Sequence, residues 1–268
     1  MTRARNHNGP DSAPHDLSLA AACDESWVAA FSSVARTARR GVVEEVEGAT
    51  IAATGVPLSA LNLAFVLSAV SDPEATVTAV MERFEGLGVP FLLIARSDGD
   101  PALPGAASAH GLGWVGDTPG MGAEPVPGSS AAQAESLRTT PVDRRSHRDF
   151  AAVTASAFDL PLDVVMDVFG PALLEAPGVA GWVGYVDGEA AATSLAIITG
   201  DTVGVYNVAT IPWLRRRGLG THMTRLALEH GVRAGCRRAV LQASPTGRPV
   251  YGRMGFRTVA TYRMHGRR

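Results

Sequence analysis

The chain has 268 residues, 46% of them hydrophobic, which is enough for two modest domains with apolar cores. No apolar run approaches the ~20 residues that cross a bilayer, and the polar N-terminus lacks the apolar core of a signal peptide. The two cysteines, Cys23 and Cys236, are far apart, as expected of reduced thiols. We therefore expect a cytoplasmic protein with no membrane contact.

The net charge of −2 conceals an asymmetry. Residues 201–268 hold thirteen arginines against two acids, a net charge of +11, whereas residues 1–200 carry −13. Such a basic segment predicts an anionic ligand or an acidic neighbouring surface. The arginines are scattered among apolar positions and the segment has no recognisable nucleic-acid-reading helix, so we expect no nucleic-acid partner.

The first half of the chain predicts an α/β unit at 15–130, preceded by a disordered tail at 1–14 and followed by a linker at 131–135. Glycine, proline and small residues dominate 111–119 and 124–130, which predicts irregular structure there. The expected helices are 17–39 and 72–87, the expected strands are 42–47, 49–53, 60–67 and 89–95, and 97–104 is an expected loop.

The second half predicts another α/β unit at 136–268. Asp187-Gly188 between two apolar runs is typical of a tight hairpin turn. The expected strands are 137–142, 181–186, 189–199, 203–211, 239–244 and 257–264, and the expected helices are 144–157, 162–174 and 221–234.

One loop carries the strongest chemical signal. After the strand ending at Ile211, Pro212 interrupts the ladder, and Arg-x-x-Gly-x-Gly follows at 215–220, immediately before a helix. The glycines allow a tight turn, and the helix start offers free N–H donors and a positive dipole end. This pattern predicts a diphosphate site. The chain has no lysine, so the Gly-Lys phosphate loop is absent, as is Gly-x-Gly-x-x-Gly.

A second motif follows about thirty residues later. The strand at 239–244 leads through a Pro- and Gly-containing turn into Tyr251-Gly-Arg-Met-Gly-Phe256. With the arginine and glycine loop, this motif resembles the GNAT superfamily of acetyl-coenzyme A-dependent N-acetyltransferases. The resemblance implies a mixed central sheet flanked by helices, with acetyl-CoA as cosubstrate and no metal ion.

The resemblance also implies roles for individual residues. Backbone groups of Val208, Ala209 and Thr210 would hold the pantetheine arm, and Tyr251 would be the general acid that protonates the leaving thiolate. Ser244 stands where the family often has Asn, so it offers pantetheine fewer donors. The diphosphate would be held by the loop and helix start, namely by Arg215, Arg216, Arg217, Gly218, Leu219, Gly220 and Thr221.

A faint repeat suggests a tandem of two such folds. Asn62-Leu63-Ala64 and Asn207-Val208-Ala209 each precede a helix and then a strand at similar distances. Where the second copy has arginines and glycines, the first has Asp72 and Glu74, which would repel a diphosphate. We therefore interpret the first half as a degenerate copy that binds no cofactor; an unrelated α/β cap is the alternative.

The acceptor and the general base stay open. The acceptor is expected to be a primary amine of a small molecule or a peptide, and the oligomeric state is open, a homodimer being one option. A non-catalytic acyl-CoA sensor would use the same cradle without turnover. The candidates for orienting water or accepting the proton are Tyr206, Asn207, Asp159, Glu189, Asp201 and His222.

Overall fold

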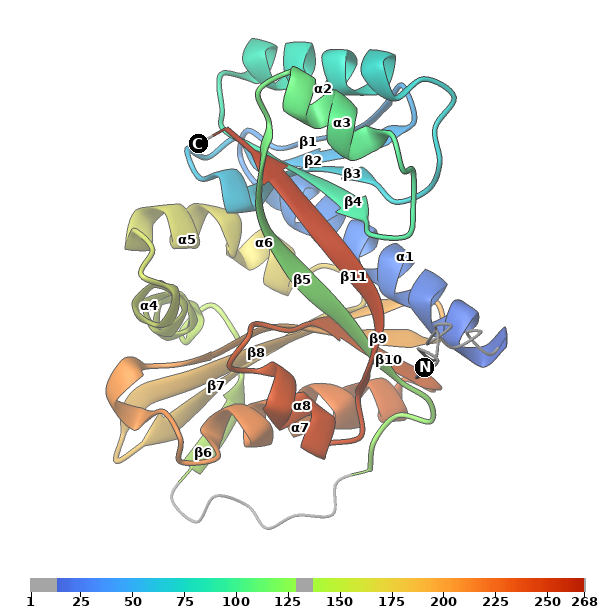
Figure 1. The fold of residues 1–268 in the computed structure, drawn as a ribbon. Coiled ribbons are helices and arrows are strands. Elements are labelled where there is room, and N and C mark those ends of the chain that lie inside the picture. The colour runs from blue at the N-terminus through green and yellow to red at the C-terminus, as the bar shows by residue number, and fades with distance from the viewer. Residues whose placement is uncertain (1–13, 129–136, 268) are drawn as a thin grey trace, which may run out of the picture.

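The computed structural model describes residues 14–128 and 137–267. Its strands form one mixed sheet in the order β1-β2-β3-β4-β11-β5-β10-β9-β8-β7-β6, flanked by helices on both faces (Figure 1). The pairs β3–β4 and β9–β10 are parallel, and the others are antiparallel. The predicted α/β class with a large central sheet is therefore confirmed.

The bounds follow chain order. The strands are β1 (Val42–Val46), β2 (Ala49–Ala53), β3 (Asn62–Val66), β4 (Leu92–Arg96), β5 (Gly113–Ala123), β6 (Leu137–Pro141), β7 (Val179–Val186), β8 (Glu189–Thr199), β9 (Thr202–Thr210), β10 (Arg238–Gln242) and β11 (Arg257–Gly266). The helices are α1 (Pro14–Thr37), α2 (Pro73–Leu87), α3 (Leu103–Ala109), α4 (His147–Phe158), α5 (Leu162–Val168), α6 (Pro171–Leu174), α7 (Leu219–Arg233) and α8 (Arg248–Arg253), with 3-10 turns η1 (Ser59–Leu61) and η2 (Pro212–Leu214).

Two similar runs of elements follow each other along the chain. The first repeat runs β3-α2-β4-α3-β5, and the second runs β9-α7-β10-α8-β11. Helices α2 and α7 each have 15 residues, and β4 and β10 each have 5. Apart from the extra edge strand β6, the strand order reads alike from both ends of the sheet. This arrangement agrees with a tandem of two related units.

The last strand of each repeat belongs to the sheet of the other. β11 pairs with β4, with Tyr262 opposite Arg96, and β5 pairs with β10, with Gly120 opposite Gln242. β5 and β11 also pair with each other at the centre, where Figure 1 shows them running between the two lobes. The division of the chain into domains at 15–130 and 136–268 stays a prediction. Each segment contributes its last strand to the other half of the sheet, so neither segment completes a sheet alone.

Strand β5 corrects the prediction of irregular structure at 111–119. A Cβ added at Gly120 would lie 2.7 Å from the Tyr262 ring and 2.9 Å from Cys23 Sγ. Gly120 therefore allows α1 and Tyr262 to lie close to the strand, and its presence reflects packing rather than a turn. The sequence pattern also missed α3, part of which lies in the expected loop 97–104.

The predicted helix over 162–174 is two helices. α5 ends at Val168 and α6 begins at Pro171, because Pro171 cannot continue a helix that started before it. The predicted tail at 1–14 lies outside the described residues except for Pro14, which begins α1, and the predicted linker at 131–135 lies outside them entirely. Within the described residues, no helix is long and apolar enough to cross a membrane.

The helices occupy opposite faces of the sheet. Alternate residues of one strand face opposite sides, and Leu93 packs with the α2 and α3 cluster whereas Ile94 packs with α1. Likewise Leu241 packs with α7, and Val240 packs with α1. α1 and α4 share one cluster, through Ala30, Val34 and Phe150 on the same face.

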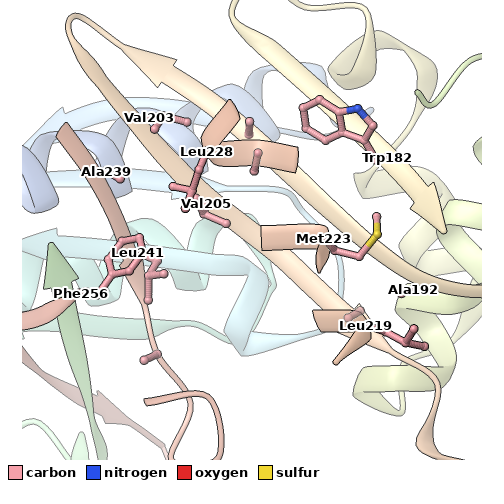
Figure 2. Close-up of a cluster of buried hydrophobic side chains, with 14 of the residues drawn as sticks. Trp182, Ala192, Val203, Val205, Leu219, Met223, Leu228, Ala239, Leu241 and Phe256 are labelled. Atoms are coloured by element: carbon pink, nitrogen blue, oxygen red, sulfur yellow. The ribbon is translucent and has the colours of Figure 1, made fainter. Parts of the chain in front are cut away.

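The α7 face has the largest apolar cluster, which lies between α7, β8, β9 and β10 (Figure 2). Leu219, Met223 and Leu228 of α7 are at most 3% exposed. Burial of a side chain of this size contributes roughly 1.5–3 kcal/mol. Packing of these side chains therefore fixes the position of α7 on the sheet.

Candidate active site

Strands β9 and β10 separate partway along their length. β10 pairs with β9 only from Thr202 to Gly204, whereas β8 follows β9 to Thr210. Among the described residues, no strand pairs with the β10 side of β9 beyond Gly204. Unpaired backbone groups on such a strand can hydrogen-bond an extended ligand, as an added strand would.

A bulge lies at the point of separation. Tyr206 is opposite Leu195 and Ala209 is opposite Thr193, so β9 holds one more residue than β8 in this interval. Asn207 has a φ of 46°, in the left-handed region, which accommodates the extra residue. The bulge changes the direction of the strand just before Val208.

The connection from β9 to α7 forms an anion cradle. Gly218 is the N-cap of α7 with a φ of 78°, a conformation that side chains disfavour. The amide of His222 donates to Gly218 O at 3.0 Å, the first bond of the helix. The amides of Leu219, Gly220 and Thr221 therefore lack helical acceptors and remain available to an anion at the positive dipole end.

The three arginines of the loop differ in their surroundings. Arg215 donates from Nε to Thr210 O at 3.2 Å and from Nη2 to Ala157 O at 2.8 Å, so it ties the loop to β9 and to α4. Arg216, with a φ of 64°, lines the cavity described below. Arg217 is exposed and lies outside the cavity lining, so its role stays a prediction.

The opposite wall is the turn from β10 into α8. The Ser244 hydroxyl accepts from the Gly247 amide at 3.1 Å and lies 3.2 Å from Thr246 Oγ1. Ser244 therefore shapes the turn that carries Tyr251, a role that the sequence pattern did not indicate.

Tyr251 combines packing with a polar position. Its ring contacts Phe256 edge-on at a centroid distance of 6.1 Å, and the residue lines the cavity. Burial raises the pKa of Tyr251, while the nearby Thr224 hydroxyl acts in the opposite direction. The phenol therefore stays protonated at neutral pH, as a proton donor must.

These walls enclose a cavity of about 710 Å³. Apart from Arg217, every binding or catalytic residue predicted from the sequence contributes to its lining. Residues that the sequence did not single out also line it. They are Ala157 and Phe158 from α4, Leu214 from the loop, and Thr246, Gly247 and Val250 from the β10–α8 turn.

The candidates for the general base are dispersed. Asp201 lies at the far end of β9, where its carboxylate binds Arg237 at 2.7 Å and its pKa is lowered mainly by that contact. Glu189 is in the exposed β7–β8 hairpin, and Asp159 follows Phe158 at the end of α4. None of the six candidates lines the cavity, but Tyr206 and Asn207 lie in the bulge beside it.

The first repeat differs at the corresponding connection. Leu63 pairs with the first residue of β4, as Thr202 pairs with the first residue of β10. Asn62 and Asn207 are therefore not equivalent, because Asn207 lies in an extension of β9 that β3 lacks. The connection after β3 spans 67–72, whereas the corresponding segment of the second repeat spans 206–218, about twice the length.

Comparison with known proteins agrees with this geometry. Residues 149–256 match the sequence model of the acetyltransferase (GNAT) family. A GCN5-related N-acetyltransferase structure from Kribbella flavida aligns with a TM-score of 0.69 at 18% identity, over 93% of this chain and 95% of that one. The comparison with curated proteins gave no match.

Two further structures also cover both halves of the chain. A putative GNAT acetyltransferase from Novosphingobium aromaticivorans has a TM-score of 0.58 at 14% identity, over 95% of this chain and 99% of that one. A GCN5-related N-acetyltransferase from Sphaerobacter thermophilus has a TM-score of 0.58 at 15% identity, over 82% and 76%. The region at 149–256, which holds the cradle and Tyr251, is therefore similar in sequence to the GNAT acetyltransferase family, and the whole chain is similar in fold to GNAT structures.

Proposed function

We propose that the protein transfers an acetyl group from acetyl-CoA to a primary amine by direct attack within a ternary complex. One observation carries the proposal: the separated β9 edge, the open N-terminus of α7 and Tyr251 border a single cavity. Each matches one part of the cosubstrate, namely the pantetheine arm, the diphosphate and the sulfur.

The residues divide the work between binding and proton transfer. Backbone groups of Val208, Ala209 and Thr210 hold the arm in an extended conformation, which orients the thioester. The α7 amides and Arg216 bind the diphosphate. Tyr251 donates its phenolic proton to the departing sulfur, so the leaving group departs as a neutral thiol. Within the described residues, no cluster of His, Cys, Asp or Glu could hold a metal ion.

The proposal is tested with the full chain in two steps. Calorimetry with acetyl-CoA measures binding, and a thiol-release assay with acetyl-CoA and a panel of polyamines, amino acids, aminoglycosides and free-N-terminal peptides measures turnover. We expect binding, and amine-dependent thiol release with at least one class. Binding without release from any amine would point instead to an acyl-CoA sensor, and absence of binding would contradict both functions.

A further inference from the structure

We propose that Tyr206 is a positioning residue of this site and that Ser26, on α1 before the first repeat, holds it in place. The first half of the chain then contributes directly to acetyl transfer, although it lines no part of the cofactor cavity. The inference rests on the proposed function, because it concerns how the β9 bulge is kept in the geometry that the reaction needs.

Asn207 in the bulge and Tyr206 directly before it are anchored to two different helices. Asn207 donates from Nδ2 to Thr154 Oγ1 of α4 at 2.8 Å, and Thr193 Oγ1 donates to Asn207 O at 3.1 Å. Tyr206 has its hydroxyl 2.9 Å from Ser26 Oγ of α1. The α4 anchor lies within the second half, whereas the α1 anchor comes from the first.

The α1 anchor is tightly packed. Ser26 has no exposed surface, and burial raises the pKa of Tyr206, so its phenol stays protonated and hydrogen-bonded. A Cβ added at Gly204 would lie 2.4 Å from Ser26 Oγ and 2.4 Å from Tyr206 Cε2. Gly204 thus leaves just enough space for the Tyr206 ring to reach α1.

The anchor acts on the segment that borders the cavity. Val208 lies in the bulge, Ala209 and Thr210 follow it, and none of the three pairs with another described strand on the β10 side. The bulge therefore sets the position of their backbone groups. Since a displacement of about 1 Å can reduce a rate by roughly 10²-fold, loosening one anchor should affect turnover more than binding.

The experiment compares Ser26→Ala and Tyr206→Phe with a matched control, Tyr262→Phe. Tyr262 is a buried tyrosine whose hydroxyl donates to Asp24 Oδ1 of α1 at 2.6 Å, but it lies on β11 away from the bulge. All three variants lose one tyrosine hydrogen bond to the same helix. The amine is the one from the panel that gives the fastest thiol release.

We expect Ser26→Ala and Tyr206→Phe to lower kcat by about 10- to 100-fold, with the KM for acetyl-CoA nearly unchanged. The double variant should be little worse than either single one, because both remove the same interaction. Tyr262→Phe should lower the Tm similarly and keep kcat. Unchanged kcat in folded Ser26→Ala, or an equal loss in Tyr262→Phe, would overturn the inference.

Amide hydrogen exchange of residues 205–210 gives a readout that needs no turnover. Exchange there should accelerate in Ser26→Ala and not in Tyr262→Phe, and the absence of that difference would overturn the anchor itself. Failure of the proposed function would be seen in a different measurement, because the wild-type protein itself would then release no thiol from acetyl-CoA.

Discussion

The two repeats start their central helices in opposite ways. In the first, Asp72 caps α2 and its carboxylate accepts from the Ala75 amide at 3.1 Å, so the helix satisfies one of its own donors. In the second, Gly218 caps α7 with no side chain, and the donors of the first turn stay open. The residue at the cap therefore decides whether the amides at the helix start are occupied by a side chain or stay open.

The length of the preceding connection reinforces this difference. β3 pairs with β4 along nearly its whole length, whereas β9 continues past its last pairing with β10. A longer strand in the second repeat supplies both the exposed edge and the bulge. In the proposed function, acetyl-CoA binding thus depends on a short extension and a glycine cap, while the shared sheet and helices only place them.

The largest effect is expected from separating the repeats. Deleting residues 1–130 removes α1 and β5, which leaves β10 without one neighbour and β11 without both. Exposed edges and apolar faces favour aggregation, so we expect fragment 131–268 to be insoluble or unfolded. Calorimetry of the full chain should show one cooperative transition. Two transitions, with a soluble and active fragment, would show that the repeats are independent.

A smaller but still large effect is expected at Tyr251. Tyr251→Phe keeps the contact with Phe256 and removes the proton donor. Turnover should fall by roughly 10²–10⁴-fold, with little change in the affinity for acetyl-CoA. Steady-state kinetics and calorimetry measure the two quantities. If kcat is unchanged while chemistry limits the rate, Tyr251 has a packing role alone.

A pair of substitutions at equivalent positions of α2 and α7 tests whether only the start of α7 binds the ligand. Gly220 and Glu74 are each the second residue of their helix. Gly220→Leu adds a side chain to the cavity lining and should reduce acetyl-CoA affinity at least tenfold in calorimetry, because the ligand loses close access to the α7 amides. Glu74→Leu should leave that affinity unchanged. Equal losses would place the ligand elsewhere.

The smallest expected effect is the pH dependence of stability caused by His265 on β11, the strand that the second repeat contributes to the sheet of the first. His265 is 4% exposed, neither ring nitrogen has a hydrogen-bond partner among the described residues, and burial lowers its pKa. As pH falls, His265 therefore takes up a proton in the unfolded chain before it does so in the folded protein. The free energy of unfolding then decreases as pH falls below about 6.5, the pKa of histidine in the unfolded chain, and stops decreasing below the lowered pKa of the folded state.

The measurement is the free energy of unfolding in denaturant between pH 5 and 8. The slope from one histidine is at most about 1.4 kcal/mol per pH unit. His265→Leu should reduce the slope without abolishing it, because burial also lowers the pKa of His222 and His230. A slope unchanged in the variant would show that His265 does not contribute.

The loop and helix start at 215–221 were readable from the sequence because their signals are local. Glycines, arginines and the start of a helix lie within fifteen residues, and each type has a direct physical reason to be there. The order of most strands and helices was also readable from periodicity. The role of Arg215 was not, because its contact with Ala157 O depends on how α4 is placed in three dimensions. The role of Ser244 was missed for another reason: its contacts with Thr246 and Gly247 are local, but the resemblance directed attention to the ligand instead.

The pairing of β5 and β11 with strands of the other repeat could not be predicted from the sequence for a related reason. β5 contains five residues that are Gly or Pro, a composition typical of loops. Its glycines are explained only by neighbours from distant parts of the chain, such as Tyr262 and Cys23 beside Gly120. The Ser26–Tyr206 contact likewise joins residues 180 positions apart. Single-sequence patterns carry no information about such pairings.

The exchange of β5 and β11 also has a consequence for synthesis on the ribosome. β4 emerges early, but its partner β11 is translated after every other strand, and β5 must wait for β10 as well. Until then the nascent chain presents incomplete sheet edges, and its native contacts span most of its length. Such topologies fold slowly. Assembly of the whole sheet, and with it the cavity between β9, α7 and α8, is therefore a late event after translation of the last strand.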